Sequence, residues 1–240
     1  MGQVVNFANL QYSEFCQGVQ RGQINNDEIH LMLAEIFVLQ PHSKLQLSCP
    51  TGSDRYFYTL TGDLKVGTLV ANENMPQDTF AVIEEGSLIY IENASNHIAQ
   101  LLSVISPPEN YQGTKYPGFS GALKILPRDQ QSVVDIPDQK KKRIYFVGKE
   151  NAKSERAHAM IVVYQHDTVT GMHMHPNAES MFILLTGKTN FTVNNQNFVV
   201  ERGDATVFPI GDRHGLKVAE GDGVSFLEFH LPAAFTSVRG

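Results

Sequence analysis

The chain has 240 residues, enough for two small domains or one large one. Hydrophobic residues make up 42% and charged residues 18%, a composition typical of a globular protein rather than a disordered one. Its formal charge of −6 argues against nucleic acid as a partner, because phosphate binding requires a basic surface. No apolar run approaches the ~18 residues of a membrane span, and residues 1–20 lack a signal-peptide core, so we expect a cytoplasmic protein without a membrane partner.

Short strands are the main predicted element. The best helix candidate is residues 9–19, and after residue 40 no long segment has the 3.6-residue period of a helix. Runs rich in β-branched and aromatic residues, bounded by turn signals, recur at 56–60, 87–91, 159–164, 181–185, 191–193, 198–200 and 224–231. Regularly spaced short strands predict an all-β sandwich or barrel.

A segment rich in proline and glycine interrupts this strand pattern. Residues 106–143 include Pro107, Pro108, Pro117 and Gly118, which favour turns over strands. We therefore expect this segment to connect two domains, residues 1–105 and 144–240.

The second of these domains offers a set of metal ligands. His173 and His175 are two residues apart, so both imidazoles project from one face of a β-strand. A bend at Pro176 could aim the carboxylate of Glu179 at the same point, and His214 could complete the set from a distant strand. Three imidazoles and one carboxylate suit Fe, Mn, Ni, Co, Cu or Zn and form a poor cage for Ca or Mg. An H-x-H pair also arises by chance among surface histidines, so the pair alone leaves the question open.

The segment around His214 resembles the second motif of the cupin superfamily, G-x5-P-x-G-x2-H-x3-N. Gly203, Pro209, Gly211 and His214 are in register, and Val218 replaces the final asparagine. The resemblance implies two tandem cupin barrels, which are double-stranded β-helices of the jelly-roll type.

The segment around the histidine pair resembles the first cupin motif, G-x5-H-x-H-x3,4-E-x6-G. Both histidines, Glu179 and Gly187 are present, but Asp167 occupies the leading glycine position and one extra residue separates Glu179 from Gly187. That residue is either a β-bulge beside the site or a sign that Ser180 occupies the ligand position. We favour Glu179, because a serine hydroxyl is the weaker ligand. The resemblance then implies one divalent transition metal per chain, bound by His173, His175, Glu179 and His214.

An internal repeat supports two barrels. Residues 57–62 resemble residues 182–187 at a shift of 125, and Gly86 and His97 have the spacing of Gly203 and His214 at a shift of 117. In this register Ser48 and Pro50 replace the histidine pair in the first half. We therefore expect the first barrel to lack a metal site and to serve packing, dimerisation or pocket closure.

The open coordination positions of such a metal are where chemistry is expected, within an apolar barrel mouth. Glu228 and His230 share a strand face with Phe226; if that face is interior, either residue could act as a catalytic base or orient a ligand imidazole. If it is exterior, both are solvated. The candidate pocket walls are Met160, Tyr164, Met172, Met181, Ile183, Phe208 and Phe226.

Three functions remain open for this site. The resemblance to cupin dioxygenases makes a dioxygenase-type oxidoreductase acting on a small organic molecule the leading hypothesis. The alternatives are a redox-neutral isomerase, dehydratase or hydrolase in which the metal acts as a Lewis acid, and a non-enzymatic barrel that binds a small ligand. The resemblance also implies a homodimer in which N-terminal strands cover exposed sheet edges.

Overall fold

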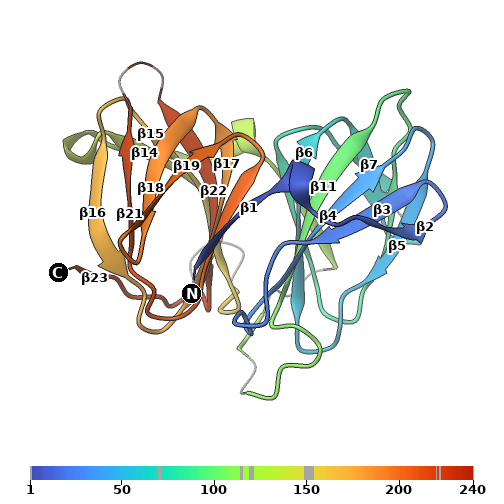
Figure 1. Ribbon diagram of the computed structural model, residues 1–240. Helices are drawn as coiled ribbons and strands as arrows, with labels where there is room; N and C mark the ends of the chain where they lie inside the picture. The colour runs from blue at the N-terminus through green and yellow to red at the C-terminus, as the bar shows by residue number, and fades with distance from the viewer. Residues whose placement is uncertain are drawn as a thin grey trace.

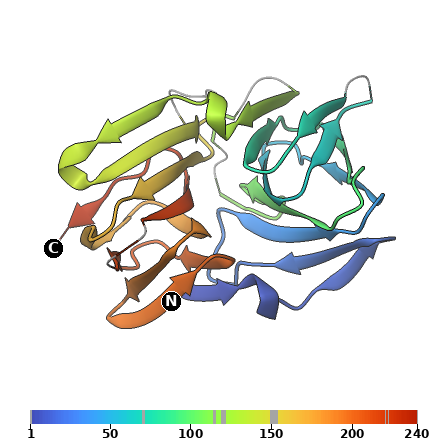
Figure 2. The same cartoon turned by 90° about the horizontal axis from the view of Figure 1, so that it is seen from above.

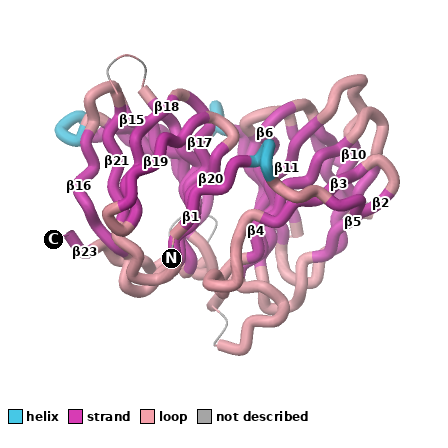
Figure 3. The backbone as a smooth tube through the Cα atoms, in the orientation of Figure 1, coloured by secondary structure: helices cyan, strands magenta, loops and turns pink. Residues whose placement is uncertain are grey.

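The computed structural model describes residues 2–69, 72–113, 116–118, 122–148, 154–219, 221 and 223–239. Its strands form four antiparallel sheets, so the predicted all-β class is confirmed (Figures 1 and 3). Helical structure in these ranges is limited to three 3-10 turns, η1 (Phe7–Asn9), η2 (Arg128–Gln130) and η3 (Pro137–Gln139). None of the helices described is long and apolar enough to cross a membrane.

The N-terminal half of the chain forms a seven-stranded and a four-stranded sheet. In spatial order, the larger sheet contains β12 (Leu123–Pro127), β9 (Thr79–Ile83), β6 (Asp54–Thr61), β11 (Ala99–Ser106), β4 (Leu33–Leu39), β3 (Val19–Gln23) and β2 (Ser13–Cys16). The smaller sheet contains β5 (Lys44–Ser48), β10 (Leu88–Glu92), β7 (Leu64–Gly67) and β8 (Asn72–Met75). Apolar side chains of both sheets, such as Phe57 and Ile89, fill the space between them.

The C-terminal half repeats this arrangement. Its larger sheet contains β1 (Gln3–Asn6), β20 (Asp204–Phe208), β17 (Glu179–Thr186), β22 (Val224–Leu231), β15 (His158–Tyr164), β14 (Lys141–Val147) and β13 (Val133–Ile136). The smaller sheet contains β19 (Gln196–Glu201), β18 (Lys188–Val193), β21 (His214–Val218), β16 (Val169–Met174) and β23 (Val238–Arg239). Phe182 and Phe191 pack between these two sheets, inside the second barrel. All seven runs expected from the sequence lie in or overlap strands.

The two halves exchange edge strands. β1 stands at the start of the chain but pairs with β20 of the C-terminal half, and β12 lies in the expected connector but pairs with β9 of the N-terminal half. Figure 2 shows the deep blue β1 beside the orange strands of the other half. The domain limits at residues 105 and 143 stay a prediction, and the exchange means that each large sheet is completed by a strand from outside its predicted domain.

The internal repeat is regular in the structure. β6 begins at residue 54 and β17 at 179, and β11 begins at 99 and β22 at 224, so both pairs are related by a shift of 125 residues. The shift of 117 that matched Gly86 and His97 to Gly203 and His214 was therefore wrong. His97 lies in an exposed loop between β10 and β11, whereas His214 begins β21, whose counterpart is β10.

The helix expected at residues 9–19 was also wrong. The chain forms η1 and then the hairpin of β2 and β3, with Cys16 opposite Val19 and a turn at Gln17 and Gly18. Gly18 has a φ of 73°, a conformation that glycine adopts without steric cost. The ladder between β3 and β4 places this hairpin on the large sheet, and these tertiary hydrogen bonds outweigh a modest local helical preference.

The two large sheets face each other across a buried region that we call the central core. It contains side chains of both halves, including Tyr56, Tyr58, Phe80, Val104, Phe146, Met181, Ile183, Leu227 and Phe229. Phe80 stacks on Phe146 with ring centroids 4.8 Å apart and lies 5.9 Å from Phe229. The middle strands of the large sheets, such as β6 and β17, are thus buried on both faces, one in their own barrel and one in the central core, which explains apolar runs such as residues 181–185.

Replacing Phe80 with alanine should test whether the central core joins the halves into one folding unit. Because Phe80 is fully buried, Phe80→Ala should lower the free energy of unfolding by about 3–5 kcal/mol in urea titrations. A single transition should shift as a whole. The exposed control Val199→Ala should change stability by less than about 0.5 kcal/mol. Two resolved transitions, only one of which moves, would show that the halves unfold independently.

Candidate metal centre

Three histidines converge inside the C-terminal barrel. His173 lies in β16, His175 directly follows that strand, and His214 begins β21. Antiparallel pairing sets His173 opposite His214, and the two-residue spacing turns His175 to the same side as His173. One ring nitrogen of each histidine lies within 4.8 Å of the other two, so this group could hold a metal ion.

Hydrogen bonds fix the orientation of all three imidazoles. The Nδ1 atoms of His173, His175 and His214 lie 3.0, 2.8 and 3.2 Å from backbone carbonyl oxygens, those of Gly171, Thr236 and Asp212. A carbonyl oxygen only accepts, so each Nδ1 carries the proton and each Nε2 presents a lone pair. In the described part of the chain, Nε2 of His175 and Nε2 of His214 are buried without a hydrogen-bond partner. Such orphans are costly, and a metal ion would satisfy both, so these residues fit a metal.

The histidines are also in the protonation state that a metal requires. Burial lowers the pKa of His173 and of His175, and it holds the pKa of His214 well below its usual range. The neighbouring imidazoles lower the pKa of His214 further. All three rings are therefore neutral near pH 7, and the neutral imidazole is the form that binds a metal.

Glu179, expected as the fourth ligand, does not join this cluster. Its carboxylate is buried against the N-terminal half, where Oε1 accepts a hydrogen bond of 2.7 Å from the N–H of His30 and Oε2 one of 2.8 Å from the N–H of Leu31. In β17, Glu179 pairs with Leu231 and Ser180 with His230. Because neighbouring residues of a strand face opposite sides, Ser180 points to the histidines and Glu179 away from them. Because one extra residue separates Glu179 from Gly187, Ser180 rather than Glu179 stands on the face where the motif places its carboxylate.

Glu228 and His230 lie on the interior face of the barrel, which is the first of the two alternatives that the sequence left open. Both are buried and line the cavity beside the histidine cluster. The ring of His230 lies 4.7 Å from that of His175, and its Nδ1 is 2.8 Å from the hydroxyl of Ser180. Its Nε2 lies 3.8 Å from Glu228 Oε2.

The carboxyl group of Glu228 is poised to exchange a proton. Burial raises its pKa to about 7, and the positive charges of Arg143 and Lys141 oppose this increase in part. The Tyr164 hydroxyl lies 3.5 Å from Oε1 and can donate a hydrogen bond to it. A carboxyl group with a pKa near neutrality can accept or release a proton at physiological pH.

The cavity beside the histidines is lined by two of the seven side chains that the sequence offered as pocket walls. The cavity is small, with a volume of about 110 Å³, and Met160 and Tyr164 line it. Phe208 stacks on His214 at 4.3 Å and Phe226 packs in the barrel core, so both lie behind the lining.

The remaining three predicted wall residues lie elsewhere. Met181 and Ile183 point into the central core, because they share the face of Glu179 rather than that of Ser180. Met172 is half-buried in β16, between Gly171 and His173, and it does not line the cavity.

Positive side chains at the cavity were missed by the sequence analysis. Lys141, Arg143 and Arg239 line it. The first two fall in the segment expected to be a connector, but their two-residue spacing in β14 is the signal that could have placed them on one face. Within the described residues, Nε of Arg143 is buried without a hydrogen-bond partner. The cavity therefore favours an anionic occupant.

The end of the chain closes the barrel over the histidines. Phe235 stacks on His230 with ring centroids 3.9 Å apart, and the carbonyl oxygen of Thr236 is the partner of His175 Nδ1. Asn177 holds this segment by donating to the carbonyl of Ala234 and accepting from the N–H of Thr236. β23 then pairs with β16 beside His173. Residues 235–239 thus cover part of the barrel mouth beside His173 and His175.

Comparisons with known proteins agree with this architecture. Residues 160–230 match the family model described as Cupin domain, and no curated protein matched the sequence. A formate complex of oxalate decarboxylase from Lactobacillus farciminis superposes with a TM-score of 0.75 at 14% identity, covering 98% of this chain and 88% of that one. A putative glyoxylate induced protein from Pseudomonas aeruginosa gives 0.78 at 14% identity, covering 95% and 88%. Protein Ylba from E. coli gives 0.77 at 11% identity, covering 96% and 90%.

The segment that matches the Cupin domain model, residues 160–230, contains both motifs that resembled that family in the sequence. The fold of the chain consists of two cupin jelly-roll barrels. The histidine cluster lies in the C-terminal barrel, within and directly beside strands that the family model covers. In the N-terminal barrel, Ser48 and Pro50 occupy the positions of His173 and His175 at the shift of 125 residues.

Substitutions should show whether the three histidines bind the metal and whether Glu179 does not. Elemental analysis of protein purified without chelator or metal-affinity resin should find about one divalent transition metal per wild-type chain. The variant His173→Ala, His175→Ala should lose this metal, because removal of ligands weakens binding by about tenfold or more. Glu179→Gln should retain it, since that carboxylate points away from the cluster. Loss of the metal in Glu179→Gln, in a protein that remains folded, would contradict this assignment.

The metal affinity should depend on pH in a range that is set by the lowered pKa values of the three buried imidazoles. A proton competes with the ion for each Nε2 only below the pKa of the folded imidazole, which lies below the ordinary ~6.5. Affinity measured by chelator competition should therefore stay nearly constant from about pH 8 to 6.5 and decline on further acidification. A decline that begins above pH 7 would show that the imidazoles are not the titrating ligands.

Proposed function

We propose that this protein is a metal-dependent enzyme that acts on a small anionic organic molecule in its C-terminal barrel. The observation that carries the proposal is the set of three neutral imidazoles, two with orphaned Nε2 atoms, beside a buried carboxyl group and a positively charged cavity wall. A protein that only stored a ligand would need no titratable group such as Glu228 at this position. The dioxygenase, the redox-neutral enzyme and the binding barrel remain the three classes to be separated.

The proposed cofactor is one divalent transition metal per chain, held by His173, His175 and His214. An all-nitrogen donor set suits Fe, Mn, Ni, Co, Cu or Zn. The bound ion would supply Lewis-acid chemistry or, if redox-active, dioxygen chemistry. Without a ligand carboxylate, the charge of a divalent ion is not reduced by the protein, which adds to the attraction for an anion.

The proposed substrate is a small carboxylate. Lys141, Arg143 and Arg239 supply positive charge at the cavity, and the orphaned N–H of Arg143 needs an acceptor. The volume of about 110 Å³ limits the molecule to a few non-hydrogen atoms. The names of two similar structures also include small carboxylates, formate and glyoxylate, which supports this class.

The proposed role of Glu228 is that of catalytic base. Its carboxylate would take a proton from the substrate, and the Tyr164 hydroxyl and the charge of Arg143 would stabilise the ionised form. His230, held by Ser180, would set the position of Glu228 and pack against His175. This arrangement favours the redox-neutral class, in which proton transfer is the central step, over the dioxygenase expected from the resemblance.

Self-association and location are further proposals. The edge strand β13 exposes Val133 and Val134, by 57% and 43%, and unpaired edges of this kind favour pairing with a second chain. We propose a homodimer, which sedimentation at micromolar concentration would test: a monomer would contradict it. The cytoplasmic location stays a prediction.

Turnover of small carboxylates should identify the reaction class. Metal-loaded protein would be incubated with a panel of two- to five-carbon carboxylates, with products followed by NMR and oxygen by electrode. We expect turnover without oxygen consumption. Oxygen uptake coupled to product would favour the dioxygenase instead, and tight binding with no turnover under any metal would favour the binding barrel.

The role of Glu228 gives a prediction on rate. Glu228→Gln should lower kcat by about 10²–10⁴ with a smaller effect on KM, because the amide cannot accept the proton. The exposed control Glu73→Gln should leave kcat unchanged. Since the acting form is the carboxylate, wild-type kcat should rise with pH through about 7. A rate that falls through this range would assign Glu228 as an acid rather than a base.

A further inference from the structure

The N-terminal barrel has a pocket of its own at the place that corresponds to the metal centre. Its volume is about 840 Å³, and Ser48 and Pro50, the counterparts of His173 and His175, line it. At the same shift of 125 residues Arg55 corresponds to Ser180, and it too lines the pocket. The two barrels are therefore open at equivalent positions but present different chemistry there.

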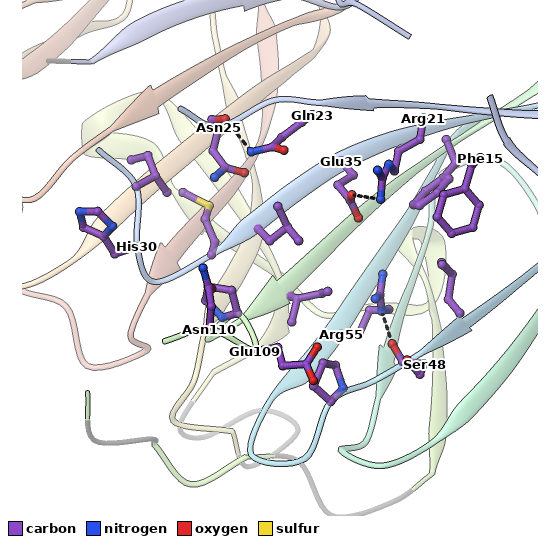
Figure 4. Close-up of a pocket in the computed structure, with 18 of the residues that line it drawn as sticks. Phe15, Arg21, Gln23, Asn25, His30, Glu35, Ser48, Arg55, Glu109 and Asn110 are labelled. Carbon is purple, nitrogen blue, oxygen red and sulfur yellow. Dashed lines mark hydrogen bonds and ion pairs between the residues drawn. The ribbon is translucent and has the colours of Figure 1, made fainter. Parts of the chain in front are cut away.

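A guanidinium group lies where the other barrel has Ser180 beside its imidazoles. Arg55 is only 6% exposed, and its side chain lies between Ser48 and the pair of Arg21 and Glu35 (Figure 4). Its Nε donates to the carbonyl of Ser48 at 3.0 Å, and Nη1 donates to the hydroxyl of Ser103 at 2.7 Å. These bonds use two of the five N–H groups of an arginine. For the other three, which include both on Nη2, no acceptor is found among the described residues.

The inner part of this pocket holds two guanidinium groups and one carboxylate. Arg21 Nη1 lies 3.4 Å from Glu35 Oε1, and Glu35 is buried. Glu35 stabilises the charge of both guanidinium groups, and solvent also balances that of Arg21, whose side chain is 44% exposed; Arg55 therefore shares one buried carboxylate with a second cation. A monoanion beside Arg55 would add a second negative charge and accept the remaining N–H groups.

The surroundings restrict the kind of anion. The fork of N–H groups on Nη1 and Nη2 matches the two oxygens of a carboxylate. Ile29, Met32 and Phe37 contribute apolar walls that suit an organic body better than an inorganic ion. At the rim, the exposed carboxylates of Asp27 and Glu109 would repel a second negative charge.

We propose that the N-terminal barrel binds a small organic monocarboxylate, with its carboxylate on the Nη1–Nη2 edge of Arg55. Asn25 also lines this pocket, and its Oδ1 accepts a hydrogen bond of 2.7 Å from the N–H of Ala34. This site is separate from the metal centre and does not depend on the proposed function of the other barrel.

Titration of the full chain followed by ¹H–¹⁵N NMR would test this site. Propionate would be the monocarboxylate probe, with propionamide as its uncharged analogue and malonate and inorganic phosphate as more highly charged anions. We expect propionate to shift the amide signals of Asn25, Ser48 and Arg55 with a millimolar Kd and propionamide to leave them unchanged. Shifts near His173 report the metal centre and are read separately, because each signal is assigned to a residue.

Variants would locate the contact at Arg55. Arg55→Met, which keeps the length of the side chain without its charge, should weaken propionate binding by about tenfold or more. Arg55→Lys should weaken it less, because the charge remains but the fork is lost. The control Arg128→Met removes an arginine paired with Asp78 outside the pocket and should leave the Kd unchanged.

Three results would overturn the proposal. The first is no propionate-dependent shift at the pocket up to about 50 mM, which corresponds to a negligible affinity. The second is equal binding of propionate and propionamide by the wild-type protein, a comparison that holds even if Arg55→Met does not fold. The third is tighter binding of malonate or phosphate than of propionate.

Discussion

The packing of the two large sheets against each other is the constraint on which the rest of the structure depends. It gives the middle strands of these sheets, such as β6 and β17, one face in a barrel and one in the central core. In β17 this divides Ser180 and Phe182, which face the barrel, from Glu179, Met181 and Ile183, which face the other half. The same constraint therefore stabilises the molecule and decides which side chains can reach the histidine cluster.

The sequence was sufficient for the fold class and for the histidines. Continuous apolar runs such as 181–185 predicted strands correctly because burial on both faces removes polar positions. His173 and His175 could be paired because side chains two positions apart on a strand face the same side. Glu179 could not be placed in this way. One extra residue in its motif reversed the face, and only the ladder with β22 and the backbone N–H groups of residues 30 and 31 show the direction of its carboxylate. The positive charges of β14 were missed because the position of that strand depends on pairing with β15, not on local sequence.

Duplication followed by divergence explains how one fold supports two kinds of site. At equivalent positions the C-terminal barrel presents neutral imidazoles, which suit a cation, and the N-terminal barrel presents a guanidinium group, which suits an anion. The scaffold around each site is conserved in topology, including the exchanged edge strands β1 and β12. Each site thus depends on a few side chains at a barrel mouth whose position the sheets determine.

The central claim is that three histidines, without Glu179, form the metal centre. It is tested most directly by an anomalous-difference map from crystals of the metal-loaded protein, recorded at the absorption edge of the bound metal. The account predicts one strong peak per chain, in contact with Nε2 of His173, His175 and His214 and separated from Glu179. A peak in contact with the Glu179 carboxylate, or no peak at the histidines in fully loaded protein, would contradict it.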